Sequence, residues 1–180
     1  MAGATGAPVG PFPEGADPAE YDKLRRRVLW TMPSGLYVVG SRHGERRNLM
    51  TLNWATQLSF DPKLVGVGVE HGALTHTLIA GGGVFSLCIV DREDRAIVRK
   101  FVKPVEEDAD GTLNGFAVVE GRTGAPILAQ SVAWLDCEVR QAVETGGHTL
   151  FVGEVVDCGF AKVEDTPVLR MEDTRMNYGG

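Results

Sequence analysis

Residues 48–62 read NLMTLNWATQLSFDP, and this run carries small polar side chains where an ordinary strand carries bulk. Its hydroxyl and amide groups surround a single tryptophan, Trp54. They offer neutral hydrogen-bond donors and acceptors but no catalytic acid, base or activated nucleophile. The polar members are Asn48, Thr51, Asn53, Thr56, Gln57 and Ser59. The run therefore predicts a binding surface on a strand, for a ligand that brings its own chemistry.

Short β-branched runs, separated by Gly, Asp and Asn, extend from this stretch in both directions. Their pattern predicts seven strands, at 36–41, 49–54, 64–70, 84–90, 116–120, 131–143 and 149–156. Seven short strands with short connections favour a mainly β fold, either an antiparallel barrel or a sandwich.

Helix signals lie at three places. Asp17 followed by Pro18 predicts a helix that ends near Trp30. Residues 75–80 predict a second helix, which three glycines at 81–83 would stop. Asp91 with Asp94 resembles a capping pair for a third helix that ends at Pro104. Its inward face would carry Ile97, Val98, Phe101 and Val102.

The strand expected at 64–70 alternates valine with glycine, at Gly66 and Gly68. Glycines in a strand remove side chains where something approaches the backbone closely. A flat ligand or a partner strand is one interpretation, and packing at a bend of the barrel is the other.

Composition predicts one acidic globular domain. The chain has 180 residues, of which 43% are hydrophobic, and this suffices for one core. Residues 1–16, rich in Gly, Ala and Pro, predict a flexible tail ahead of a domain at 17–180. A net charge of -6 argues against nucleic-acid and anionic-membrane surfaces. No stretch has the apolar length of a membrane span or the pattern of a secretory signal, so we expect a cytoplasmic protein.

The reactive side chains favour no hydrolase and no metal site. Cys88, Cys137 and Cys158 are widely spaced, and we expect the first two to be small core residues. His71 and His76 lack a third ligand at metal-binding spacing. Nucleophile-elbow, P-loop and dinucleotide-fold glycine motifs are missing.

His148 follows Gly146-Gly147 and begins an apolar run, so it should lie at the mouth of a hairpin. By itself it could be an exposed turn histidine. For a phosphate, the candidates are the hydroxyl groups of residues near predicted helix and strand starts, with Arg47 or Lys100 adding charge. These hydroxyl residues are Thr56, Ser59, Thr75 and Thr77.

Several short motifs occur in an order that resembles the flavin reductase-like family, which has the FMN-binding split-barrel fold. They are Met32-Pro33-Ser34-Gly35, residues 48–54 with Ser59-Phe60-Asp61-Pro62, Phe85, residues 124–128, Cys137-Glu138-Val139 and residues 147–155. The resemblance runs from about Trp30 to the C-terminus. It departs from the family pattern at Gly147, Asn53 and Cys88, where Asp, Ser and Asn are common.

This resemblance implies an antiparallel Greek-key split β-barrel with a few peripheral helices. It also implies a site for FMN or FAD. Asn48, Met50 and Thr51 would line the isoalloxazine ring, and Trp54, Ala55, Thr56, Gln57 and Ser59 would carry the ribityl chain and phosphate, with Thr75 and Lys100 adding phosphate contacts. His148 would orient the nicotinamide of NADH or NADPH, and the C-terminal tail at 175–180 would lie near the flavin or a dimer partner.

The implied activity is that of an NAD(P)H:flavin oxidoreductase, which passes a hydride from the nicotinamide to the flavin. The resemblance also implies a homodimer that supplies reduced flavin to a partner monooxygenase. The alternative is an FMN-holding electron-transfer flavoprotein without its own pyridine nucleotide site.

Overall fold

A computed structural model describes residues 10–174, which fall into two compact units divided after Pro33. The first unit contains helix α1, Pro18–Leu29. Asp17 caps it as predicted, because its carboxylate accepts a hydrogen bond of 2.9 Å from the Glu20 N–H. Most of the predicted flexible tail and all of the tail at 175–180 lie outside the described residues.

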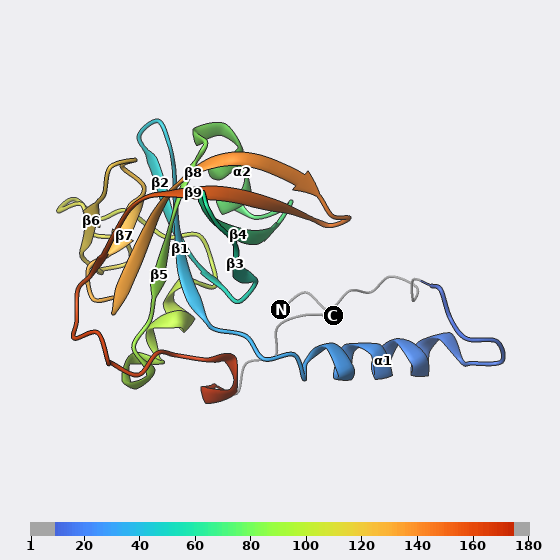
Figure 1. The fold of residues 1–180 in the computed structure, drawn as a ribbon. Coiled ribbons are helices and arrows are strands. Elements are labelled where there is room, and N and C mark those ends of the chain that lie inside the picture. The colour runs from blue at the N-terminus through green and yellow to red at the C-terminus, as the bar shows by residue number, and fades with distance from the viewer. Residues whose placement is uncertain (1–9, 175–180) are drawn as a thin grey trace. The chain divides into compact units, whose positions relative to one another are not determined.

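The second unit, Ser34–Thr174, is built on one antiparallel sheet in the order β2-β1-β5-β8-β9-β4-β3. Its strands are β1 (Tyr37–His43), β2 (Arg46–Leu52), β3 (Ala55–Phe60), β4 (Lys63–Glu70), β5 (Val84–Ile89), β8 (Ala133–Glu144) and β9 (His148–Phe160). A second small sheet pairs β6 (Val118–Glu120) with β7 (Pro126–Leu128). Figure 1 shows the strands curling around a common interior.

The link between β2 and β3 requires the large sheet to close on itself. These strands stand at opposite ends of the sheet order, yet only Asn53 and Trp54 join them. In a flat sheet, six strand spacings would separate them by about 29 Å. Three peptide steps reach at most about 11 Å. The sheet therefore rolls into a barrel, and the prediction of a mainly β, antiparallel barrel with a few peripheral helices is confirmed.

Residues 48–62 form two strands, which corrects the prediction of a single strand at 49–54. Trp54 lies between β2 and β3 rather than in a strand. Strand β3 was missed because it is mostly exposed and has a register shift between Gln57 and Ser59, so no alternation marks it. The three-residue strand β7 was also missed.

Of the other two helix predictions, one is confirmed and one is wrong. Helix α2, Leu74–Gly82, ends at Gly83, whose φ of 69° confirms the glycine stop. The third predicted helix is instead two 3-10 turns, η1 (Arg92–Asp94) and η2 (Ile97–Phe101). A 3-10 turn has three residues per turn, so it orients the residues after Phe101 differently from an α-helix. Val102 is 47% exposed, and its predicted inward position is therefore wrong. A third 3-10 turn, η3, covers Met171–Asp173.

The barrel core is apolar and tightly packed. Phe85 and Phe151 are fully or almost fully buried, and the predicted core positions of Cys88 and Cys137 are confirmed. Asp136 is a buried polar residue of β8, and its carboxylate accepts a hydrogen bond of 2.8 Å from the Thr123 N–H. Within residues 10–174, no helix has the length and apolar character needed to cross a membrane.

Candidate functional site

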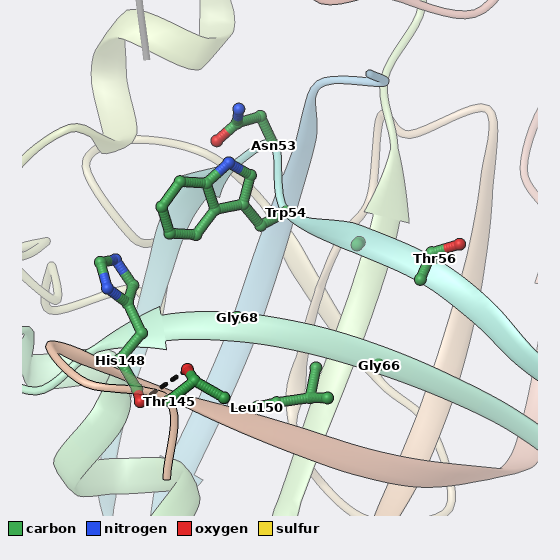
Figure 2. A pocket seen from close by; sticks show the side chains of 9 residues that line it. Asn53, Trp54, Thr56, Gly66, Gly68, Thr145, His148 and Leu150 are labelled. Carbon is green, nitrogen blue, oxygen red and sulfur yellow. Dashed lines mark hydrogen bonds between the residues drawn. The ribbon is translucent and has the colours of Figure 1, made fainter. Parts of the chain in front are cut away.

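A pocket of about 450 Å³ lies where the β2–β3 link meets strand β4 and the β8–β9 hairpin (Figure 2). It is lined by Asn53, Trp54, Ala55, Thr56, Gly66, Gly68, Thr145, His148 and Leu150. Of the described residues that line it, none carries a permanent charge. The pocket therefore suits a neutral, partly apolar group.

Strand register explains how these distant residues meet. On the β3–β4 side, Thr56 pairs with Gly66, and the Gly68 N–H donates to the Trp54 carbonyl at 2.8 Å. On the β4–β9 side, Gly68 pairs with Leu150. Side chains two residues apart on a strand share a face. Leu150 and His148 therefore lie on the same side of β9, next to the glycines of β4.

Trp54 and His148 form the aromatic wall of the pocket. Their ring centroids are 4.6 Å apart with an angle of 51° between the planes, and Figure 2 shows the two rings side by side. Trp54 is 44% exposed, so a ligand can still reach the indole face. The His148 carbonyl accepts hydrogen bonds from the Thr145 N–H at 2.8 Å and its hydroxyl at 2.9 Å. The tip of the hairpin is thus folded tightly around His148.

The two glycines of β4 form part of the pocket floor, and neighbouring side chains already pack over them. A Cβ at Gly68 would lie 3.4 Å from the Trp54 ring, and one at Gly66 would lie 2.7 Å from Leu58 Cδ1. Packing therefore accounts for part of the glycine pattern. The pocket lining shows that backbone is also accessible there.

A second hollow, of about 470 Å³, lies on the other side of β3 and shares Ala55 and Thr56 with the first. It is mainly apolar, with Leu87 and Val155 among its lining residues. Tyr37 also lines it, and burial raises the pKa of this phenol. Strand β3 is thus the partition between two hollows.

Asn48, Thr51 and Thr75 belong to a buried polar network. The Asn48 amide donates to the Thr75 hydroxyl at 2.9 Å and accepts from the Val105 N–H at 2.9 Å. The Thr51 hydroxyl donates to the Val98 carbonyl. In the described part of the chain, these side chains line neither hollow. Their polar groups are used to hold β2 to α2 and η2.

Of the remaining candidates, Trp54, Ala55, Thr56 and His148 meet in the pocket. Gln57 lines the second hollow, and its amide donates to the Ser59 carbonyl at 3.2 Å. Met50 packs against the barrel core. Lys100 is an exposed residue of η2. The roles of these residues toward a flavin stay predictions.

Two pocket residues, Thr145 and Leu150, were missed. Leu150 stands two positions after His148, so strand alternation could have placed it on the same face. Thr145 precedes two glycines at a hairpin tip, and no sequence pattern indicated that its side chain would turn toward the strand.

A polar cluster lies at the base of the same hairpin. Glu144 bonds His71 Nε2 at 2.8 Å and accepts from the Thr149 hydroxyl at 2.9 Å. His76 Nε2 lies 2.8 Å from the same hydroxyl oxygen. Burial, and then the nearby His71, lower the pKa of His76, and Glu144 opposes this shift. Among residues 10–174, no group of His, Cys, Asp or Glu side chains is arranged to hold a metal ion.

Comparisons with known proteins agree with the sequence resemblance. An NADH-dependent FAD reductase of Streptomyces globisporus is 32% identical over 151 residues, which are 82% of this chain and 81% of that protein. The solved structure of the NADH:FAD oxidoreductase SgcE6 from S. globisporus C-1027 has a TM-score of 0.72 and 28% identity. The structural match covers 89% of this chain and 93% of the SgcE6 chain.

Some relatives are much longer than this chain. Diflavin flavoprotein A 1 of Synechocystis sp. is 30% identical over 147 residues, which are 79% of this chain but only 25% of that protein. The family model described as "Flavin reductase like domain" matches residues 29–179, most of the chain and all of its barrel strands. The chain therefore belongs to the flavin reductase-like family.

Proposed function

We propose that this protein is an NAD(P)H:flavin oxidoreductase, with NADH as donor and FAD or FMN as acceptor. The observation that carries the proposal is the neutral pocket in which Trp54 and His148 stand over the glycine floor of β4. Two relatives of similar length support it, since they are named as NADH-dependent flavin reductases.

The pocket fits a flat, neutral ring. Its volume of about 450 Å³ is within the usual range for small-molecule sites. The Trp54 indole offers an apolar face, and Asn53 and Thr56 offer neutral polar groups at the rim. An isoalloxazine or a nicotinamide matches this chemistry, whereas a phosphate would need donors from outside the lining.

A flavin bound here supplies the redox chemistry, because its ring accepts a hydride from the nicotinamide C4. The protein's task is then to position two rings. Trp54 would provide the stacking surface, and Thr56 would hydrogen-bond the polar chain of the flavin. His148, beside Trp54 on the same wall, would orient the nicotinamide and exclude water from its face. Positioning of this kind accelerates a reaction without a catalytic acid or base.

The test is anaerobic reduction of added flavin, followed by visible absorbance. NADH and NADPH are supplied separately to protein mixed with FAD or FMN. We expect NADH to bleach the flavin catalytically. A flavin that stays oxidised with both nucleotides would contradict the proposal.

Two variants should separate the two ligands. His148→Ala should slow NADH oxidation more than it weakens flavin binding, and Thr56→Val should do the reverse. His43→Ala and Thr166→Val, at sites outside the pocket lining, are the matched controls. Equal effects in all four variants would place the site elsewhere.

An FMN-holding electron-transfer flavoprotein is the second candidate. The observation in its favour is that the chain matches only a quarter of a diflavin flavoprotein, where the matching segment is one part of a larger protein. Flavin that copurifies with the protein, and that neither pyridine nucleotide reduces, would favour this function.

We also propose that the protein is a homodimer, as the resemblance implies. The edge strand β3 exposes apolar side chains, with Phe60 80% and Leu58 46% exposed. A second copy would cover them, and uncovered apolar edges favour association. Light scattering on a sizing column should show a dimer that Phe60→Glu dissociates. A monomeric wild-type protein would refute this point.

Delivery of reduced flavin to a partner monooxygenase, in the cytoplasm, completes the proposal. A shallow site at the rim of a barrel supports release of a reduced flavin. The test is whether this protein, given NADH, sustains a flavin-dependent monooxygenase that receives no other reduced flavin.

A further inference from the structure

The polar cluster at the base of the β8–β9 hairpin lies outside the pocket lining. We propose that Glu144 is a positioning residue, which ties the turn carrying Thr145 and His148 to the start of α2. This inference rests on the proposed function, because it assigns the hairpin turn to the nicotinamide side of the pocket.

The sheet supports the tip of the hairpin on one side only, because β9 is paired with β4 as far as His148 but β8 has no second strand partner there. Strand β5 pairs with β8 only from Ala133 to Glu138. Beyond that point, β8 pairs only with β9 among the described strands, and residues 140–144 are exposed. Figure 1 shows the hairpin extending past the other strands. Residues 140–144 thus have a strand neighbour on one side only, and such a segment moves more easily than one paired on both sides.

Two kinds of bond tie the tip to the segment before α2. The paired residues of β4 and β9 end with Glu70 and His148, and the His71 N–H then donates to the Gly147 carbonyl at 3.1 Å. The His71 side chain makes the second bond, from Nε2 to Glu144 at 2.8 Å. The backbone of His71 therefore holds Gly147 on one side of the turn, and its side chain holds Glu144 on the other.

The second carboxylate oxygen of Glu144 extends the hydrogen-bond network to the buried Thr149. It accepts from the Thr149 hydroxyl, which has only one proton and so accepts in turn from His76 Nε2. This places a proton on His76 Nε2, and burial, which lowers the pKa of His76, favours the neutral form of the ring. The hydrogen bonds therefore run in one direction from His76 to Glu144.

The exposure of Glu144 makes the role testable. Its side chain is 72% exposed and that of His71 is 41% exposed, and exposed ion pairs contribute little to global stability. Removing the carboxylate should therefore leave the barrel folded. What changes is the freedom of residues 145–148, and with it the contact between His148 and Trp54.

The experiment compares Glu144→Ala with Glu138→Ala, a second glutamate of β8 that pairs with Arg140 at 2.9 Å. We expect Glu144→Ala to raise the KM for NADH roughly 10-fold or more, because small displacements at a reactive site are costly. Flavin affinity should change by less than about twofold, since Trp54 and Thr56 stay in place. Glu144→Gln, which keeps the hydrogen-bond acceptor, should restore much of the loss.

A readout in the ligand-free protein tests the same inference independently. In a Trp30→Phe, Trp134→Phe background, the remaining Trp54 reports on the His148 ring 4.6 Å away. We expect Glu144→Ala, but not Glu138→Ala, to change Trp54 emission and its pH dependence. That pH profile is compared with those of the His71→Ala and His76→Ala variants.

The outcomes separate the two hypotheses. If the wild-type protein does not oxidise NADH, the proposed function fails, and Trp54 emission still decides whether Glu144 positions His148. If Glu144→Ala and Glu138→Ala give the same Trp54 emission, the positioning role is wrong, whatever the activity. Should Glu144→Ala fail to fold, the comparison is made with Glu144→Gln, for which unchanged emission would support the inference and loss of folding would overturn it.

Discussion

Replacing Asn48 with alanine tests whether this residue holds the barrel or the ligand. Asn48 is 2% exposed, and its amide bonds both the Thr75 hydroxyl and the Val105 N–H. The substitution leaves these two groups without their partner. Each unsatisfied group costs about 1–3 kcal/mol, so the free energy of unfolding should fall by about 2–6 kcal/mol.

The assay is thermal or urea unfolding, read beside a flavin titration. For a domain of this size, each kcal/mol shifts Tm by about 2–4 °C, so a loss of at least about 4 °C is expected. Asn53→Ala is the control, because Asn53 is half-buried and lines the pocket. It should leave Tm nearly unchanged and weaken ligand binding.

Thr75, whose hydroxyl accepts the hydrogen bond from Asn48, allows a second test of the same contact. Thr75→Val removes the other end of the same hydrogen bond, so the double variant should lose less stability than the two single losses together. A Tm shift of less than about 2 °C in Asn48→Ala, together with loss of flavin binding, would refute the structural role of Asn48. Asn48 would then contact the flavin, as the sequence resemblance implies.

Three further outcomes follow from the structure. Trp54→Ala should weaken flavin binding by about 5- to 150-fold, the equivalent of about 1–3 kcal/mol of stacking, and an affinity within about twofold of wild type would contradict the placement of the ring. Gly153→Ala should destabilise the barrel by about 1–3 kcal/mol in urea unfolding, because the new Cβ would lie 2.5 Å from Phe85 Cε1, while Gly147→Ala, with no described atom within 4 Å of its Cβ, should not. The pKa of His76 is lowered below its usual 6.5, so the unfolded chain binds more protons between the two values, and Tm should decrease as pH falls below about 6.5. His76→Phe should reduce that decrease, and an unchanged pH profile would show that His76 does not cause it.

Sequence patterns predicted the parts of the fold where one local rule acts alone. The Asp17-Pro18 start of α1 and the glycine stop of α2 are capping rules that need no tertiary contact. The run at 131–143 likewise marked β8, although the burial of Asp136 depends on Thr123 from a loop and could not be predicted from the sequence. Exposed β3 has no such pattern, since an edge strand buries no regular face.

The residues of the site were likewise only partly predictable from the sequence. Chemistry alone indicated that residues 48–62 bind a ligand, and the Trp54–Thr56 part does line the pocket. The same chemistry could not show that Asn48 and Thr51 turn inward, because that depends on the position of η2 and the residues after it. A buried amide with satisfied hydrogen bonds and a ligand-binding amide look alike in a sequence.

The pocket lies where the two-residue link between β2 and β3 closes the barrel. Trp54 sits where the rolled sheet is joined, and His148 faces it from β9, which lies two strands away across β4. A ligand bound against this aromatic pair would contact both strands, and it would stabilise the closed form by an amount that grows with ligand concentration. Hydrogen exchange of the β3 amides should then slow on ligand binding more than that of strands on the far side. Lengthening this link by one residue would move Trp54 relative to β4, so the closure of the barrel and the shape of the site depend on the same two residues.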